Sequence, residues 1–293
     1  MTVYIIANPH AGAQLAVDLV EEIQVNYPHL EKKIFFTTCP NDEKNQVQLA
    51  LQTWQEGDTF LVIGGDGTLS KVLYHLPQNI PFSYYPVGSG NDFARALQLP
   101  DLAATIANIE AGNTREITIF AAEEGILLNS LDLGFAAWVV NEAAHSTLKR
   151  LLNRLYLGKL TYIFVAILSL LKNPVASVKI QKNNQEILEL DHVYFFSVAN
   201  NTYFGGGIMI WPTATVYDSQ LHMVYAKGET FWKRLAILLT LVFKQHQQSS
   251  YLQHEVLETA HIKIPRESIV EVDGEIISSR ELTLKAQKRK IYL

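Results

Sequence analysis

Three glycine-bearing turns constrain the fold of this chain more than any other feature of its sequence. The turns are Asn8-Pro9-His10-Ala11-Gly12, Gly64-Gly65-Asp66-Gly67-Thr68 and Gly88-Ser89-Gly90-Asn91-Asp92. Each one follows a segment that predicts a buried strand, and each precedes a segment with the apolar spacing of a helix. Strands that alternate with helices predict βαβ units and a mostly parallel sheet.

In a parallel sheet, the three turns would lie together at the carboxyl ends of their strands, where open α/β sheets bind ligands. Glycines let backbone N–H groups approach an anion, and the N-termini of the following helices favour phosphate. Asn8, Thr68 and Ser89 can add side-chain hydrogen bonds. Asp66 could hold a metal that bridges phosphates, because Mg²⁺ prefers one or two carboxylates together with phosphate oxygens. The pattern therefore predicts a phosphate-binding edge.

The pattern changes after Gly112, where most segments resemble strands, including Glu124–Leu133 and Glu186–Ala199. Two helical stretches, Glu142–Leu171 and Phe231–Gln247, interrupt them. A chain of 293 residues is long enough for two domains. We expect an α/β first domain and a β-rich second domain.

Composition excludes several classes of protein. The net charge of −5 argues against a dedicated nucleic-acid binder. The single cysteine, Cys39, excludes an internal disulfide framework and a multi-cysteine metal cluster. No basic, signal-like start and no apolar stretch of about 20 residues is present, so we expect a cytoplasmic protein. The sequence also lacks the Walker A loop, the dinucleotide fingerprint and the protein-kinase signature.

Several motifs together resemble one known family. The turn Gly64–Thr68 combined with Pro86-Val87-Gly88-Ser89-Gly90-Asn91-Asp92-Phe93-Ala94-Arg95 resembles the diacylglycerol kinase catalytic domain. Phe204-Gly205-Gly206-Gly207, Pro212-Thr213-Ala214 and Glu271-Val272-Asp273-Gly274-Glu275 resemble the family's second-domain and late motifs. The resemblance is to the bacterial soluble lipid-kinase branch and extends over nearly the whole chain.

This resemblance implies a fold of two domains. The first is a Rossmann-like parallel α/β domain over residues 1–114, to which residues 287–293 return. The second, over residues 115–286, is a β-sandwich with helical inserts that would receive the lipid. Catalysis would take place in the cleft between them.

The resemblance also implies the chemistry, which is transfer of the γ-phosphate of ATP to a lipid hydroxyl, most simply diacylglycerol to phosphatidate in phospholipid biosynthesis. Asp273 would be the general base, Glu275 would assist it, and Asp66 would lie by the phosphates and the catalytic Mg²⁺. The residues expected around ATP are Asn8, Pro9, His10, Ala11, Gly12, Thr37 (or Thr38), Gly64, Gly65, Asp66, Gly67, Thr68, Leu69, Ser70, Gly88, Ser89, Asn91 and Asp92.

The sequence departs from the family at a structural metal site of the second domain. Tyr217 replaces the first aspartate of that segment, and Thr118 stands near another family aspartate. If the site persists, its ligands would be the Asp218 carboxylate and the backbone carbonyls of Thr215 and Gln220.

The lipid substrate implies transient contact with a membrane, and the family implies a homodimer. Leu148–Leu171 carries Lys149, Arg150, Arg154 and Lys159 before an apolar run. A basic-then-apolar helix could lie on an anionic membrane surface. It could equally cover the sheet of the second domain, with its basic residues in water.

Three alternative functions remain open at this point. The Gly-Gly-Asp-Gly-Thr turn also occurs in NAD kinases, although Asp92-Phe93-Ala94-Arg95 differs from their pattern. A non-catalytic regulator that binds lipid or nucleotide is suggested by the changes at Thr118 and Tyr217. The acceptor could also be another lipid alcohol, such as a sphingoid base or a polyprenol.

Overall fold

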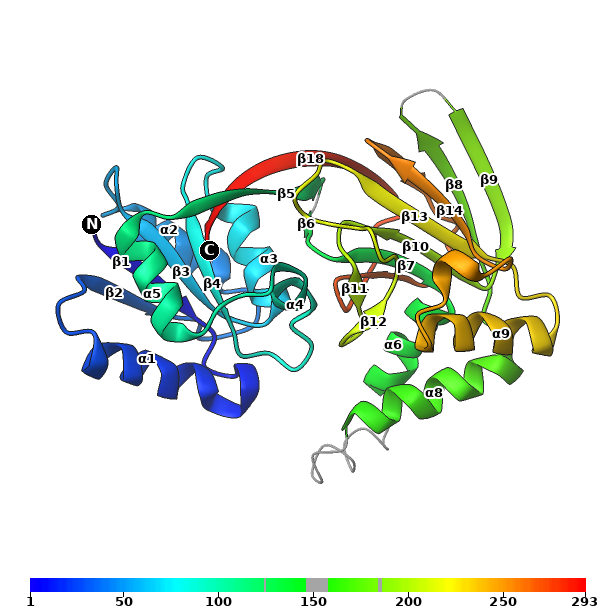
Figure 1. The fold of residues 1–293 in the computed structure, drawn as a ribbon, viewed down its shortest axis with the longest axis horizontal. Coiled ribbons are helices and arrows are strands. Elements are labelled where there is room, and N and C mark those ends of the chain that lie inside the picture. The colour runs from blue at the N-terminus through cyan, green and yellow to red at the C-terminus, as the bar shows by residue number, and fades with distance from the viewer. Residues whose placement is uncertain (124, 146–157, 184–185) are drawn as a thin grey trace.

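The structure, a computed structural model, describes residues 1–123, 125–145, 158–183 and 186–293. Figure 1 shows two bodies, bridged by two strands that run from one to the other. These strands are β5 (Thr114–Ala122) and β18 (Glu281–Tyr292).

The first body is a parallel sheet in the strand order β2-β1-β3-β4, with helices on both faces. Its strands are β1 (Val3–Ala7), β2 (Lys32–Phe36), β3 (Thr59–Gly64) and β4 (Phe82–Pro86). Its helices are α1 (Leu15–Asn26), α2 (Glu43–Leu51), α3 (Asp66–His75), α4 (Asp92–Leu97) and α5 (Leu102–Ala111), with a short 3₁₀ helix, η1 (Ala11–Gln14).

Strand β1 shows why these segments are apolar without alternation. Val3 and Ile5 pack with α1 and α5, whereas Tyr4 and Ile6 pack with α2 and α3. A strand that is buried on both faces needs apolar side chains at every position.

The second body is a sandwich of two sheets that bury one core between them. One sheet has the order β14-β13-β10-β7-β16-β17, and the other contains β18, β15, β8 and β9 together with β5 and β6. Both contribute to the shared core, for example through Leu131 and Leu284. The strands not yet given are β6 (Gly125–Leu127), β7 (Ser130–Gly134), β8 (Ala176–Lys182), β9 (Glu186–Val193), β10 (Phe195–Ala199), β13 (Leu221–Ala226), β14 (Gln253–Leu257), β15 (Ala260–Lys263), β16 (Val270–Val272) and β17 (Glu275–Ile277).

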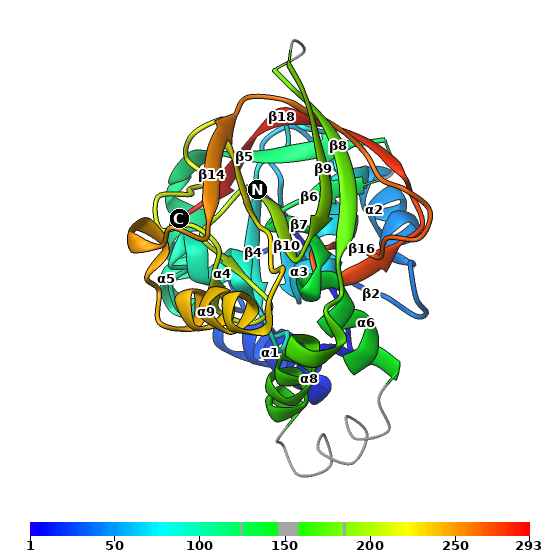
Figure 2. The ribbon, with the colours of Figure 1, turned by 90° about the vertical axis from the view of Figure 1, so that its right-hand side faces the viewer.

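Helices cover the outer face of the six-stranded sheet (Figure 2). They are α6 (Phe135–His145), α8 (Gly158–Lys172) and α9 (Phe231–Val242), with a short 3₁₀ helix, η2 (His246–Gln248). A small hairpin, β11 (Tyr203–Phe204) with β12 (Ile208–Met209), projects toward the first body. In the described part of the chain, no helix is both long and apolar enough to cross a membrane.

The long strand β18 makes the two bodies share one sheet. Its first part pairs with β15 of the sandwich, and its last part lies beside β5, with Ile291 opposite Phe82 of β4. Arg289 on β18 is buried and donates to the carbonyl oxygens of Leu73 and Leu76 at the end of α3. The last strand therefore also holds the helix that starts at Asp66.

The structure confirms the predicted fold class, a parallel α/β first domain and a β-sandwich second domain with helical inserts. The expectation of single strands over Glu124–Leu133 and Glu186–Ala199 is wrong. The chain passes from one sheet to the other at Asn129 and again at Tyr194. Both apolar runs look continuous because the chain stays buried while it changes sheets.

Candidate functional site

The three glycine-bearing turns meet at one edge of the parallel sheet, because β1, β3 and β4 all end there. Asn8 donates from Nδ2 to the Thr68 hydroxyl at 3.2 Å and accepts the backbone N–H of His10 at 3.0 Å. Asn91 donates from Nδ2 to the carbonyl oxygen of Gly88 at 2.7 Å. The predicted phosphate-binding residues of the three turns are thus brought together.

Two glycines are required by the close approach of these turns. Gly12 has a φ of +61°, and a Cβ there would lie 2.2 Å from the Val87 carbonyl oxygen. A Cβ on Gly88 would lie 2.7 Å from Cα of Gly65. Larger residues would push the turns apart and open the backbone surface that they form.

Asp66 stands at the start of α3, and its carboxylate is held by four donors. The backbone N–H groups of Asp92 and Phe93 and the Asn129 side-chain amide donate to Oδ2, and the Tyr84 hydroxyl donates to Oδ1. Burial raises the pKa of Asp66, while the donated hydrogen bonds act against this rise. The N-terminus of α4 therefore points at the carboxylate of α3 and fixes its orientation.

Asp92 has a different role in the geometry from the ATP contact that was expected. Its carboxylate forms an ion pair with Arg95 and accepts the backbone N–H of Gly206 at 2.7 Å. Arg95 also lies over the ring of Tyr203, 5.7 Å from its centroid. We call Asp92, Arg95, Tyr203 and Gly206 the interdomain clamp, because they join α4 to the β11–β12 hairpin.

Asp273 lies in the tight turn between β16 and β17, with a left-handed φ of +50°. Its carboxylate accepts three backbone N–H groups, those of Leu128, Asn129 and Ser130, at 2.8, 2.7 and 3.2 Å. Burial raises the pKa of Asp273 to about 7, although these donors favour the charged form. A carboxyl group with this pKa can accept a proton near neutral pH.

Asn129 links the two carboxylates. Its side-chain amide donates to Asp66, and its backbone N–H donates to Asp273. Asn201 in turn holds Asn129, by donating to Asn129 Oδ1 at 2.6 Å and to the Leu128 carbonyl oxygen. Asp66 also raises the pKa of Asp273 by charge repulsion, so the pair presents excess negative charge.

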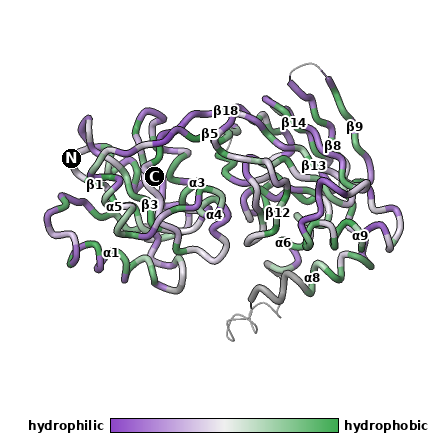
Figure 3. Tube along the Cα trace, viewed as in Figure 1, coloured by the Kyte–Doolittle hydropathy of each residue, from purple (hydrophilic) through white to green (hydrophobic). Residues whose placement is uncertain are grey.

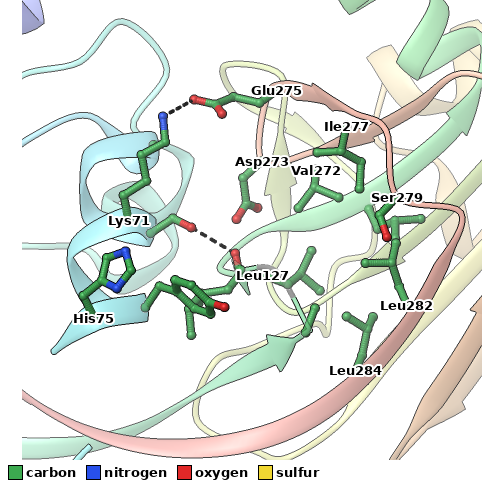
Figure 4. Close-up of a pocket in the computed structure, with 17 residues that line it drawn as sticks. Lys71, His75, Leu127, Val272, Asp273, Glu275, Ile277, Ser279, Leu282 and Leu284 are labelled. Carbon is green, nitrogen blue, oxygen red and sulfur yellow. Dashed lines mark hydrogen bonds and ion pairs between the residues drawn. The ribbon is translucent and has the colours of Figure 1, made fainter. Parts of the chain in front are cut away.

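An apolar cavity of about 190 Å³ opens beside Asp273 (Figure 4). Figure 4 shows Val272, Ile277, Leu282 and Leu284 on one side and α3 on the other. Lys71 of α3 and Glu275 of β17 form an ion pair of 3.0 Å across the cavity. The site therefore joins a charged end to an apolar one.

The remaining predicted residues lie in different surroundings. Ser70 donates to the Ile126 carbonyl oxygen and lines the apolar cavity, and Leu69 is buried in the core of the first domain. Thr37 is buried and donates its backbone N–H to Ala7 at the end of β1, while the Thr38 hydroxyl donates to Asp42. Pro9, His10 and Ala11 follow β1, and Ser89 is exposed in the third turn.

The proposed cation ligands in the second domain lie apart from this site. Asp218 is the only carboxylate of the three, and it accepts the backbone N–H of Gln220. The Lys288 ammonium donates to the Thr118 hydroxyl at 3.0 Å, in the region where the family aspartate was expected. A lysine there supplies positive charge of its own, and the donor set of Thr215, Asp218 and Gln220 stays a prediction. The basic positions Lys149, Arg150 and Arg154 lie outside the described residues, as does the backbone between α6 and α8.

Sequence reasoning missed Asn129, Tyr84, Asn201 and Lys71. Asn129 was hidden inside an apparently continuous strand, and Tyr84 inside an apolar one. The pair Asn200-Asn201 at the end of the strand Phe195–Ala199 was an available signal, because polar residues that follow a buried strand often line a ligand edge.

Comparison with known proteins identifies both parts of the chain. A model of the diacylglycerol kinase catalytic domain matches residues 2–122, and one of the YegS C-terminal NAD kinase beta sandwich-like domain matches residues 132–291. The "Putative lipid kinase YtlR" of Bacillus subtilis is 26% identical, over 96% of this chain and 95% of its own. A diacylglycerol kinase of Staphylococcus carnosus is 23% identical, over 92% of this chain and 87% of its own. A solved Bacillus anthracis structure, described as a "putative diacylglycerol kinase", is 21% identical, with a TM-score of 0.77 over 99% of this chain and 94% of its own. That likeness shows a shared fold.

Proposed function

This chain belongs to the diacylglycerol kinase catalytic-domain family, and we propose that it transfers the γ-phosphate of ATP to the hydroxyl of a lipid, with diacylglycerol as the expected acceptor. One observation carries the proposal. The Asp273 carboxyl, whose pKa is about 7, lies at an apolar cavity and is tied through Asn129 to Asp66 among the glycine-bearing turns.

In this proposal Asp273 accepts the proton of the lipid hydroxyl while that oxygen attacks the γ-phosphorus. Phosphoryl transfer depends mainly on positioning and on neutralisation of charge. The three backbone N–H groups position the Asp273 carboxylate, and Glu275 lies near it at the cavity. Asn129 keeps the base at a fixed place relative to Asp66, and so relative to the phosphates.

ATP would lie along the three turns, with its phosphates against the backbone N–H groups at Gly64–Thr68 and Gly88–Asn91. The described residues include no cluster of three or more His, Cys, Asp or Glu side chains that could hold a metal by itself. Asp66 does fit a Mg²⁺ ion that arrives with ATP, because one buried carboxylate plus phosphate oxygens is a usual Mg²⁺ environment. When bound, Mg²⁺ would offset the negative charge shared by Asp66, Asp273 and the phosphates.

The cavity supports a lipid acceptor that is only partly enclosed. A volume of about 190 Å³ is below the ~300–1,000 Å³ of pockets that enclose whole small molecules. The cavity would therefore take the part of the lipid next to its hydroxyl, and the rest of the acyl chains would stay outside, in the bilayer.

We also propose that helices α8 and α9 bring the protein to the cytoplasmic face of a membrane. Phe164, Ile167 and Leu171 form an exposed stripe on α8, and Trp232, Leu239 and Phe243 form one along α9 and at its end. The green segments of α8 and α9 in Figure 3 show how apolar both helices are. Lys172, Lys227 and Lys244 flank these stripes and would favour anionic lipid. We call these six apolar residues the α8–α9 face.

The two helices are locked together at this face. The buried Arg234 of α9 donates to the carbonyl oxygens of Leu170 and Gly228, both at 2.9 Å. The Ser169 hydroxyl lies 2.7 Å from that of Tyr194, which anchors α8 to the sheet. The exposed stripes therefore sit on a fixed support.

The test of the function is incubation with γ-labelled ATP, Mg²⁺ and a panel of diacylglycerol, a sphingoid base, a polyprenol and NAD. Label in an organic-phase product of the wild-type protein, and none with Asp273→Asn, would support the proposal. Label in NADP would instead identify an NAD kinase. No product with any acceptor would favour a binding protein and would overturn the proposed activity.

A further inference from the structure

Two buried carboxyl groups outside the predicted site lie side by side behind Asp273. Asp132 of β7 and Glu271 of β16 are cross-strand partners, and their side chains are hydrogen-bonded to each other. Asp132 is fully buried and Glu271 almost so. They point away from the Leu131 side of the sheet, since successive side chains of a strand alternate.

Hydrogen bonds connect this pair to the base at both ends. Glu271 accepts the backbone N–H of Gly274, the residue that follows Asp273 in its left-handed turn. Asp132 accepts the hydroxyl of Ser130, whose backbone N–H donates to Asp273. A closed ring therefore runs from Asp273 through Ser130, Asp132, Glu271 and Gly274 back to Asp273.

The pair must hold a proton to exist in this place. Two ionised carboxylates in contact, both out of water, would repel each other and lose their hydration. The groups that face them are Ser130 on β7, Ser197 on β10, and Asp273 with Gly274 beyond β16. Within the described residues, no lysine, arginine or histidine side chain is paired with either carboxyl. Burial and this repulsion raise the pKa of Glu271 well above its usual range, and burial raises that of Asp132.

We propose that Asp132 and Glu271 are a positioning pair that shares one proton and fixes the Asp273–Gly274 turn, and with it the catalytic base, against the N–H groups of Leu128–Ser130. The inference rests on the proposed function only in taking Asp273 as the base. One carboxyl donates the shared proton to the other, and Glu271 remains free to accept from Gly274. Neither side chain contacts the substrate in this arrangement.

The kinetic test compares Glu271→Ala with Glu271→Gln. The alanine loses the bond to Gly274, so the base is misplaced, and we expect kcat to fall about 10- to 100-fold with KM for ATP unchanged. Glutamine can donate to Asp132 and accept from Gly274, and it should recover most of the loss. Glu267→Ala, an exposed acid in the loop before β16, is the matched control. A folded Glu271→Ala protein with wild-type kcat and pH profile would overturn the proposal.

A second measurement needs neither lipid nor a truncating variant. Carbon-13 NMR of side-chain carboxyl groups in the wild-type protein should find one carboxyl of the pair still protonated at pH 7, assigned through Glu271→Gln and Asp132→Asn. The Asp273 resonance should titrate near 7 in the wild type, and its midpoint should shift in Glu271→Gln combined with Asp132→Asn, where the shared proton is lost. If both carboxyl groups are ionised at pH 7, the proposal fails, whether or not the protein phosphorylates a lipid. If the pair is protonated but no lipid is phosphorylated, the proposed function fails and the positioning pair stands.

Discussion

At the scale of single residues, the site depends on how buried carboxylates are held. Asp66 and Asp273 each accept several hydrogen bonds, and most of these come from the backbone. Backbone donors cannot swing away, so both groups are oriented before any ligand arrives. Burial raises the pKa of both, which leaves Asp273 available as a base only above a certain pH.

The pH dependence of the activity follows from Asp273. With a pKa of about 7, the carboxyl is protonated at lower pH and cannot accept a proton from the substrate. We expect kcat/KM to fall about tenfold per pH unit below 7 and to level off above it. Measurement of kcat/KM from pH 5.5 to 9 tests this, and a profile with a midpoint near 4 would contradict it. Asp273→Asn should lose about 10²- to 10⁴-fold in kcat, as expected for loss of a general base.

Asn129 should matter almost as much as the carboxylates that it joins. Asn129→Ala removes the amide that donates to Asp66 and accepts from Asn201, while its backbone N–H still reaches Asp273. We expect kcat to fall about 10- to 100-fold through misalignment of phosphate and base. Asn113→Ala, at an exposed loop asparagine, is the control. Equal kcat for both variants would show that the link between the carboxylates has no catalytic role.

At the scale of secondary structure, the elements of the first domain could be predicted and part of the site could not. Glycine-bearing turns after apolar strands carry a local signal, because each turn is built by neighbours in the chain. Asn129 is positioned by the crossing from β6 to β7, which an unbroken apolar run conceals. The Asp132–Glu271 contact depends on the pairing of strands that are far apart in sequence. The long strand β18, with its charged residues at 285, 288, 289 and 290, lacks the apolar pattern of a buried strand.

The α8–α9 face leads to a prediction about membrane binding. Trp232→Glu should weaken binding to vesicles that contain anionic lipid about 10- to 100-fold, because burial of one large apolar side chain contributes ~1.5–3 kcal/mol. Val25→Glu is the control, since Val25 of α1 is 75% exposed and Trp232 is 74% exposed. Sedimentation with vesicles measures both variants. Equal loss of binding would mean that no particular face docks.

At the scale of the whole molecule, two kinds of connection set how the domains face each other. One is covalent and continuous, through the sheet that β5 and β18 carry from one body to the other. The other is the interdomain clamp between α4 and the β11–β12 hairpin. The sheet acts like a spine on one side, and the clamp closes the molecule on the other. The phosphate turns and Asp273 both lie between these connections, so their spacing depends on both.

The clamp can be loosened without touching the carboxylates that carry out the chemistry. Arg95→Ala removes the ion pair with Asp92 and the contact with Tyr203, while Asp92 keeps its bond to Gly206. A hydrogen bond to a charged group contributes about 1.5–3 kcal/mol, so we expect kcat/KM to fall about 10- to 100-fold as the closed arrangement becomes less populated. Small-angle X-ray scattering should show a larger radius of gyration for this variant, with Arg266→Ala, at an exposed arginine of the second domain, as the control. A loss of activity without any change in scattering would assign Arg95 a direct role at the phosphates instead, and unchanged activity would mean that β5 and β18 alone fix the distance between the two halves of the site.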